Sequence, residues 1–149
     1  PDDKRDIYDI LTALEPEAAA MLAVQNPNAS DLTPLLDATS DMERALDQDD
    51  LETWAEADDR FHRTLIQMSG NSRLLSIVGT LNDQAHRARI ATLRHREKPV
   101  ASTRDHRDIL TYLAAGDAAR TREAFRTHRQ RAANELVGLL STSAPVPAS

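Results

Sequence analysis

The sequence predicts an all-α fold, an antiparallel bundle of about six helices, from three observations. Apolar residues make up 40% of the 149 residues and come mainly from Ala and Leu, while aromatic residues make up only 3%. The chain has four Gly and few runs of β-branched residues, which favours helices over strands. Apolar residues also recur at helical spacing in six segments joined by short polar stretches, which is typical of an antiparallel bundle.

The first two helices are expected on either side of a polar loop. The first runs from Ile7 to Val24, and Pro16 inside it predicts a kink or a break near Glu15. Residues 25–30 (QNPNAS) have the composition of a loop. A second helix follows to about Leu46, with Ser30 or Asp31 as the N-cap.

The third and fourth helices are separated by a compact stop signal. Residues 49–50 (Asp-Asp) supply an N-cap for a helix from Leu51 to Met68, which residues 69–71 (Ser-Gly-Asn) end. Asn71 or Ser72 then opens a fourth helix that runs towards Leu93 and is basic in its distal part.

The last two helices meet at a Gly-Asp pair. Ser102 or Thr103 is expected to cap a fifth helix that ends near Ala115. Gly116 and Asp117 supply the C-terminal stop and the next N-cap, and a sixth helix extends to about residue 140. Residues 141–149 (STSAPVPAS) are small, polar and Pro-bearing, which predicts a disordered tail.

Composition and charge exclude several classes of protein. No apolar run approaches the roughly 20 residues that span a bilayer, and the chain starts without the apolar region of a secretion signal, so no membrane association is expected. Residues 1–6 are interpreted as the remnant of a linker, because the chain lacks an initiator Met. The absence of Cys fits a cytoplasmic location. With a net charge of −6, the chain is not expected to bind DNA by itself.

Three of the five His residues fall on the apolar faces of different helices. In the third helix, Asp58 and His62 are four residues apart on the face that carries Trp54 and Leu65. His106 and His128 occupy the equivalent faces of the fifth and sixth helices. The other two, His86 and His95, lie in the basic segment and are expected at the surface.

Burying four such polar groups together requires a compensating interaction. An unpaired buried polar group costs about 1–3 kcal/mol, and an ionised carboxylate costs far more. A metal ion removes the cost because it takes neutral imidazole nitrogens and a carboxylate oxygen as ligands. The set suits one divalent transition metal, zinc foremost, with nickel, manganese or iron as alternatives. The other interpretation is a set of hydrogen-bonded core histidines, with Asp58 and His62 as a simple helical pair.

Five short motifs in order resemble the FCD domain, the C-terminal effector-sensing domain of the FadR subfamily of GntR transcription regulators. They cover the chain from about Ile7 to residue 140. The motifs are residues 57–62 (ADDRFH), 69–71 (SGN), 105–110 (DHRDIL), 115–117 (AGD) and His128. Single motifs of this kind are weak, but five in register are specific.

The resemblance implies a bundle in which Asp58, His62, His106 and His128 bind the metal. It also implies a homodimer, and an N-terminal winged helix-turn-helix domain that is absent from this chain and that would contact operator DNA. Asp105 stands where the family usually has Glu.

A second departure from the family pattern concerns effector binding. Leu11 occupies the place where many members carry an Arg that holds an effector carboxylate. Arg89 is the candidate substitute, together with Asn82 on the same helical face, although Arg89 could instead be a solvent or interface charge.

The expected function is therefore a sensor and not an enzyme. Four protein ligands leave one or two positions on the metal open, and a small metabolite, most simply a carboxylate, can occupy them. Two alternatives remain at this point: a structural metal in a dimerisation module, and a mononuclear metalloenzyme.

Overall fold

The computed structural model describes residues 2–142 and contains six α-helices, as the sequence predicts. The helices are α1 (Asp2–Val24), α2 (Thr33–Asp47), α3 (Leu51–Met68), α4 (Ser72–Thr92), α5 (Val100–Ala114) and α6 (Ala118–Thr142), with a short 3₁₀ turn η1 (Leu93–His95) after α4. Within the described part of the chain, no helix is long and apolar enough to cross a bilayer.

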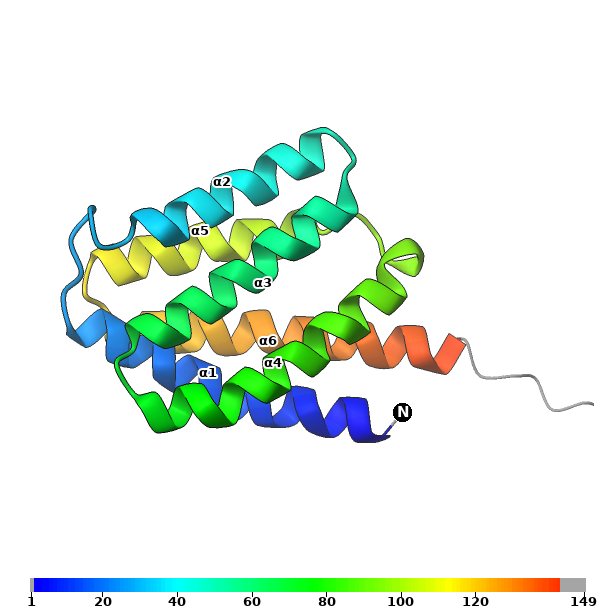
Figure 1. Cartoon of the computed structure of the whole chain (residues 1–149), viewed down its shortest axis with the longest axis horizontal. Coiled ribbons are helices and arrows are strands. Elements are labelled where there is room, and N and C mark those ends of the chain that lie inside the picture. The colour runs from blue at the N-terminus through cyan, green and yellow to red at the C-terminus, as the bar shows by residue number, and fades with distance from the viewer. Residues whose placement is uncertain (1, 143–149) are drawn as a thin grey trace, which may run out of the picture.

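The helices pack in antiparallel pairs around one core. α1 lies along α6, α2 along α3, and α5 contacts both α2 and α6, while α4 contacts α1 and α3 (Figure 1). The first and last helices are therefore neighbours although they are farthest apart in the sequence. Phe61, Phe125 and a set of Leu, Ile and Ala side chains fill the centre. This arrangement brings the inward faces of α3, α5 and α6 together.

Three predicted caps are confirmed. The Asp50 side chain accepts a hydrogen bond from the Thr53 amide at 3.1 Å, and the Asn71 side chain accepts one from Leu74 at 3.0 Å. Gly116 has φ +67°, a conformation that Gly adopts without strain, and Asp117 caps α6 by accepting from the Arg120 amide.

The expected starts of α2 and α5 are wrong. Asp31 does not cap α2, because its carboxylate accepts from the Asn28 amide in a preceding turn; the helix starts at Thr33, with Pro34 in its first turn. Helix α5 starts at Val100, so Thr103 lies inside it. Its hydroxyl donates to the Pro99 carbonyl instead of capping the helix.

The outer helices are longer than expected. α1 begins at Asp2, five residues before the predicted start. Its first turn is acidic, and the helix dipole stabilises acidic residues at that end. The same helix continues through Pro16, so no break occurs near Glu15. α6 ends at Thr142, and the remainder of the predicted tail, residues 143–149, lies outside the described residues.

Candidate functional site

Helix α3 places a carboxylate and an imidazole in the core. Its inward face buries Trp54 and Leu65 and, between them, Asp58 and His62, which are 1% and 2% exposed. The two polar residues are one helical turn apart, so both point to the same side. Asp58 Oδ1 lies 3.4 Å from His62 Nε2. The predicted orientation of this pair is confirmed.

Helices α5 and α6 bring the other two histidines to the same point. His106 Nε2 lies 3.0 Å from Asp58 Oδ1, and His128 packs its ring against His62 with centroids 5.5 Å apart. One candidate ligand atom from each of the four residues lies within 4.8 Å of every other. Two atoms bound to one ion at about 2.1 Å each lie about 3.4 Å apart in tetrahedral geometry, so metal binding requires the four side chains to draw closer together.

The cluster contains buried polar atoms that the protein itself does not satisfy. Asp58 Oδ1, His62 Nε2 and His106 Nε2 have no well-formed hydrogen bond among the described residues, although they face one another. Such atoms are costly to bury unless something binds them. Nitrogen and oxygen donors that converge in this way are consistent with a site for a divalent transition metal.

Arg89 reaches the same cluster from α4. Its Nη1 lies 3.1 Å from Asp58 Oδ2, and the whole side chain is buried. Burial alone would raise the pKa of Asp58, but the guanidinium and His62 lower it well below its ordinary value. Asp58 is therefore ionised, with one oxygen towards Arg89 and the other towards the histidines.

Two carboxylates orient the histidines from behind. Asp105 Oδ2 lies 3.1 Å from His128 Nδ1, which leaves Nε2 as the nitrogen that can bind a metal. His62 Nδ1 has two neighbours: Glu15 Oε2 at 3.4 Å, and Arg129 Nη2 at 3.2 Å, which can only donate to it. Binding of an ion at Nε2 places a proton on Nδ1; that proton is then directed to Glu15, and Nδ1 no longer accepts from Arg129. Carboxylates in this position fix the tautomer and ring orientation of metal-binding histidines.

The protonation of the histidines also favours metal binding. Burial lowers the pKa of His128 to about 3 and also lowers that of His106, so both rings are neutral near pH 7. Burial and Arg129 lower the pKa of His62 too, but Asp58 and Glu15 outweigh them and raise it. Protons therefore compete with a metal mainly at His62.

A buried ion pair beside the cluster was not expected from the sequence. Arg129, 1% exposed, donates through Nη2 to Glu15 Oε1 at 2.6 Å and to Asn82 Oδ1 at 3.0 Å, and its Nε also bonds Glu15. Burial by itself raises the pKa of Glu15, but Arg129 and then His62 lower it to about 2. Leu11, where the family pattern has Arg, is simply part of the apolar core.

The sequence does carry signals for these residues. Glu15 lies four residues after Leu11 on the inward face of α1, an unusual place for a carboxylate without a partner. Arg129 is four residues after the core residue Phe125, and Asp105 directly precedes His106.

The remaining sequence candidates fall into two groups. Asn82 is buried on the same face of α4 as Arg89, as expected, and its Nδ2 has no partner among the described residues. His95 is exposed, while His86 is half-buried, and neither lies in the cluster.

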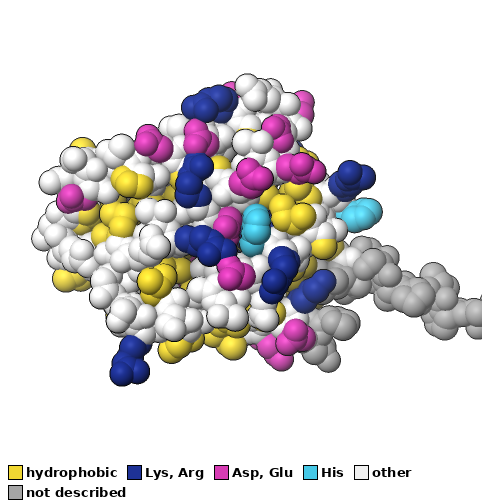
Figure 2. All heavy atoms as spheres, in the orientation of Figure 1, with side chains coloured by type: hydrophobic (Ala, Val, Ile, Leu, Met, Phe, Trp, Pro, Cys, Tyr) yellow, Lys and Arg dark blue, Asp and Glu magenta, His cyan; other side chains and the backbone are white. Residues whose placement is uncertain are grey.

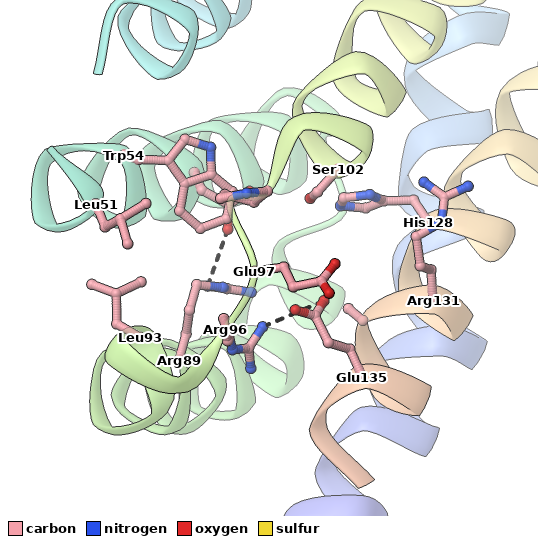
Figure 3. Close-up of a pocket in the computed structure, with 13 residues that line it drawn as sticks. Leu51, Trp54, Arg89, Leu93, Arg96, Glu97, Ser102, His128, Arg131 and Glu135 are labelled. Atoms are coloured by element: carbon pink, nitrogen blue, oxygen red, sulfur yellow. Dashed lines mark ion pairs between the residues drawn. The ribbon is translucent and has the colours of Figure 1, made fainter. Parts of the chain in front are cut away.

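A narrow cleft opens onto the cluster. Asp58, Arg89 and His128 line its inner end. Its apolar lining residues are Leu51, Trp54, Leu93, Pro99 and Ala132, and the first three are labelled in Figure 3. The cleft is tight enough that a ligand larger than a water molecule or two requires its walls to move apart.

The molecular surface lacks a continuous basic patch on the face seen in Figure 2. Acidic and basic side chains are interspersed there with apolar ones. A surface that binds nucleic acid usually concentrates basic residues.

Comparison with protein families gives one match over most of the chain: a model of the FCD domain matches residues 6–131. An HTH-type transcriptional regulator of Agrobacterium vitis, from the TAR-I ttuE-ttuC' intergenic region, is 46% identical over 68 residues, 44% of this chain and 40% of that protein. An HTH-type transcriptional regulator of Streptomyces ambofaciens, from an unstable DNA locus, is 32% identical over 79 residues, 53% of this chain and 34% of that protein. The matches thus span well under two thirds of these curated relatives.

Two solved structures share the fold. E. coli McbR/YncC superposes with a TM-score of 0.77 at 21% identity, covering 92% of this chain and 67% of the other. The metal-free FCD domain of TM0439 superposes with a TM-score of 0.72 at 21% identity, covering 93% and 94%. At this identity the likeness establishes the helical arrangement.

Proposed function

The chain belongs to the FCD domain family of FadR-type GntR transcription regulators, and from that premise we propose that it senses a small carboxylate metabolite at a bound metal. Asp58, His62, His106 and His128 hold the ion in this proposal, with zinc as the preferred metal. Arg89 and Asn82 contribute to effector binding. The chain is a regulator domain and not an enzyme.

The observation that carries the proposal is the cleft that reaches the cluster. Asp58 and His128 both belong to the candidate metal site and line the cleft. A structural zinc site is tetrahedral and closed, whereas an ion held by these four ligands accepts a further ligand only if it becomes five- or six-coordinate and is accessible from one side. The position of the cleft therefore favours effector sensing over the alternative of a purely structural ion in a dimerisation module.

Arg89 gives the site its preference for an anion. In the structure its charge is balanced by Asp58. When Asp58 coordinates a divalent ion, the same carboxylate is shared between two cations. A carboxylate ligand on the metal restores the balance and can accept a bidentate hydrogen bond from the guanidinium.

The wider protein follows from the family and from the curated relatives. The intact regulator is proposed to be a cytoplasmic homodimer with an N-terminal winged helix-turn-helix domain that binds operator DNA. Binding of the effector moves the walls of the cleft, which include η1 and the connection to α5. Such movement controls DNA binding only if the effector has different affinities for the two domain arrangements.

The proposal is tested by titrating carboxylates into the chain with and without metal, using isothermal calorimetry. We expect binding to zinc-loaded protein, weaker binding after Arg89→Gln, and none to chelator-treated protein. His128→Ala is expected to abolish both metal retention and carboxylate binding. Equal binding with and without metal would contradict the proposal.

A further inference from the structure

Arg96, directly after η1, is a buried cation that takes no part in the proposed metal site. Its side chain is 7% exposed, and its Nε donates to Thr92 Oγ1 at 2.9 Å. Nη1 lies 3.9 Å from Glu135 Oε2, which is too long for a hydrogen bond. Nη2 is buried and has no hydrogen-bond partner within the described residues. A charged donor in this position requires an acceptor.

The other arginines of the cleft are better satisfied. Arg89 lies 3.1 Å from Asp58, and Arg131 donates to Asp105 on the neighbouring helix. Arg96 therefore differs from both, since its acidic neighbour Glu135 is distant and itself 39% exposed. The unsatisfied guanidinium lines the cleft, which an organic ligand enters only when its walls move apart.

The cleft separates Arg96 from the metal cluster by an apolar surface. Trp54 donates its Nε1 proton to Thr103 Oγ1 at 2.9 Å, so the rest of the indole presents carbon atoms to the cleft. Leu51 and Leu93 continue this wall. In Figure 3, Arg96 lies across the cleft from Trp54 and His128. A ligand that spans the cleft thus meets the metal cluster at one end and Arg96 at the other, with this apolar wall and the polar Glu97 and Ser102 along its length.

We infer that the effector is a bifunctional acid: a carboxylate at the metal end and a second oxygen acceptor, bound by Arg96, at the other end of a short carbon chain. This inference rests on the proposed function. The second group is a carboxylate or a hydroxyl, because both present an oxygen to Nη2. A carboxylate is held by Arg96 alone, whereas a hydroxyl can also donate to Glu135.

The test compares acids of equal length on the zinc-loaded chain by calorimetry. Pentanoate, 5-hydroxypentanoate and glutarate share a five-carbon backbone and differ only at the far end, and the four- and six-carbon sets vary the span. For at least one length, a bifunctional acid is expected to bind about 10- to 100-fold more tightly than the monocarboxylate. The better of the two bifunctional acids identifies the second group.

Variants assign the preference to Arg96. Arg96→Gln is expected to remove the advantage of the bifunctional acid while leaving the affinity for the monocarboxylate unchanged, and Arg96→Lys to retain part of it. Arg94→Gln is the matched control, because Arg94 is exposed in the same turn. Metal content and melting temperature establish that each variant is folded.

Two results would overturn the inference, and they differ from a failure of the proposed function. The inference is wrong if the monocarboxylate binds as tightly as both bifunctional acids at every length. It is also wrong if Arg96→Gln still binds the bifunctional acid more tightly than the monocarboxylate, because Arg96 then does not bind the second group. If no acid of either kind binds to the metal-loaded chain, the proposed function fails together with the inference.

Discussion

Replacement of Arg129 by Met breaks the buried ion pair that joins α1 and α6 beside the site. Arg129 and Glu15 are 1% and 0% exposed, so the variant leaves a carboxylate in the core without its cation. Removal of one partner of a buried pair typically costs 3–5 kcal/mol. The pKa of Glu15 gives a similar figure: the difference between its ordinary value of 4.5 and about 2 is equivalent to about 3 kcal/mol.

The assay is urea unfolding followed by circular dichroism, in chelator, so that loss of metal does not contribute. Arg122→Met is the matched control, because Arg122 pairs with Glu17 across the same two helices but at the surface, where the side chains are 37% and 46% exposed. An exposed pair contributes about 0–1 kcal/mol. A loss below about 1 kcal/mol for Arg129→Met, or equal losses for the two variants, would refute the reasoning.

The same pair predicts a dependence on pH. Because the folded pKa of Glu15 lies below its unfolded value, its contribution is fully present above pH 4.5 and is lost as pH falls towards 2. In Arg129→Met, burial without the guanidinium raises the pKa of Glu15. Acidification therefore protonates Glu15 in the variant and removes the cost of burying its unpaired charge. The stability difference between wild type and variant is therefore expected to narrow between pH 7 and pH 4. A difference that grows over this range would contradict the assignment.

Further predictions concern metal binding and the turn between α5 and α6. Asp105→Asn is expected to weaken zinc affinity about 10- to 100-fold, measured by competition with a chromogenic chelator, because it removes the carboxylate behind His128; an unchanged affinity would exclude that role. Chelation of the zinc-loaded chain is expected to lower the melting temperature but to keep the helical circular dichroism, since the apolar core is complete without an ion; loss of helicity would show that the metal is needed for folding. Gly116→Ala is expected to lose more than about 1 kcal/mol in urea unfolding, because φ is +67° and the added Cβ would clash with Asn26 Oδ1. Gly79→Ala, with open space around its Cβ in α4, is its control and is expected to be neutral or stabilising.

The helical architecture follows from the sequence because each helix has a regular apolar face. In α5, for example, the structure buries the face that carries His106, as the helical spacing predicts, together with Ile109, Leu110 and Leu113. Helix ends were less predictable where two local interactions compete. Asp31 has the chemistry of an N-cap, yet its carboxylate is used by Asn28 in a turn, and Pro34 positions the start of α2 instead.

The centre of the site was predictable, and its surroundings were not. Asp58 and the three histidines interrupt apolar faces at helical spacing, so each was visible on its own helix. The partners of these residues come from helices that the sequence does not place next to one another. Glu15 and Arg129 are 114 residues apart and meet only because α1 packs along α6.

Metal content tests the central claim most directly. Purified chain is incubated with zinc, passed through a desalting column and examined by elemental mass spectrometry, beside His106→Ala and the control His95→Ala, whose side chain is exposed. The account predicts about one zinc per chain in wild type and His95→Ala, and loss of the ion in His106→Ala. No retained metal in wild type, or full retention in His106→Ala, would contradict the site and the sensing mechanism built on it.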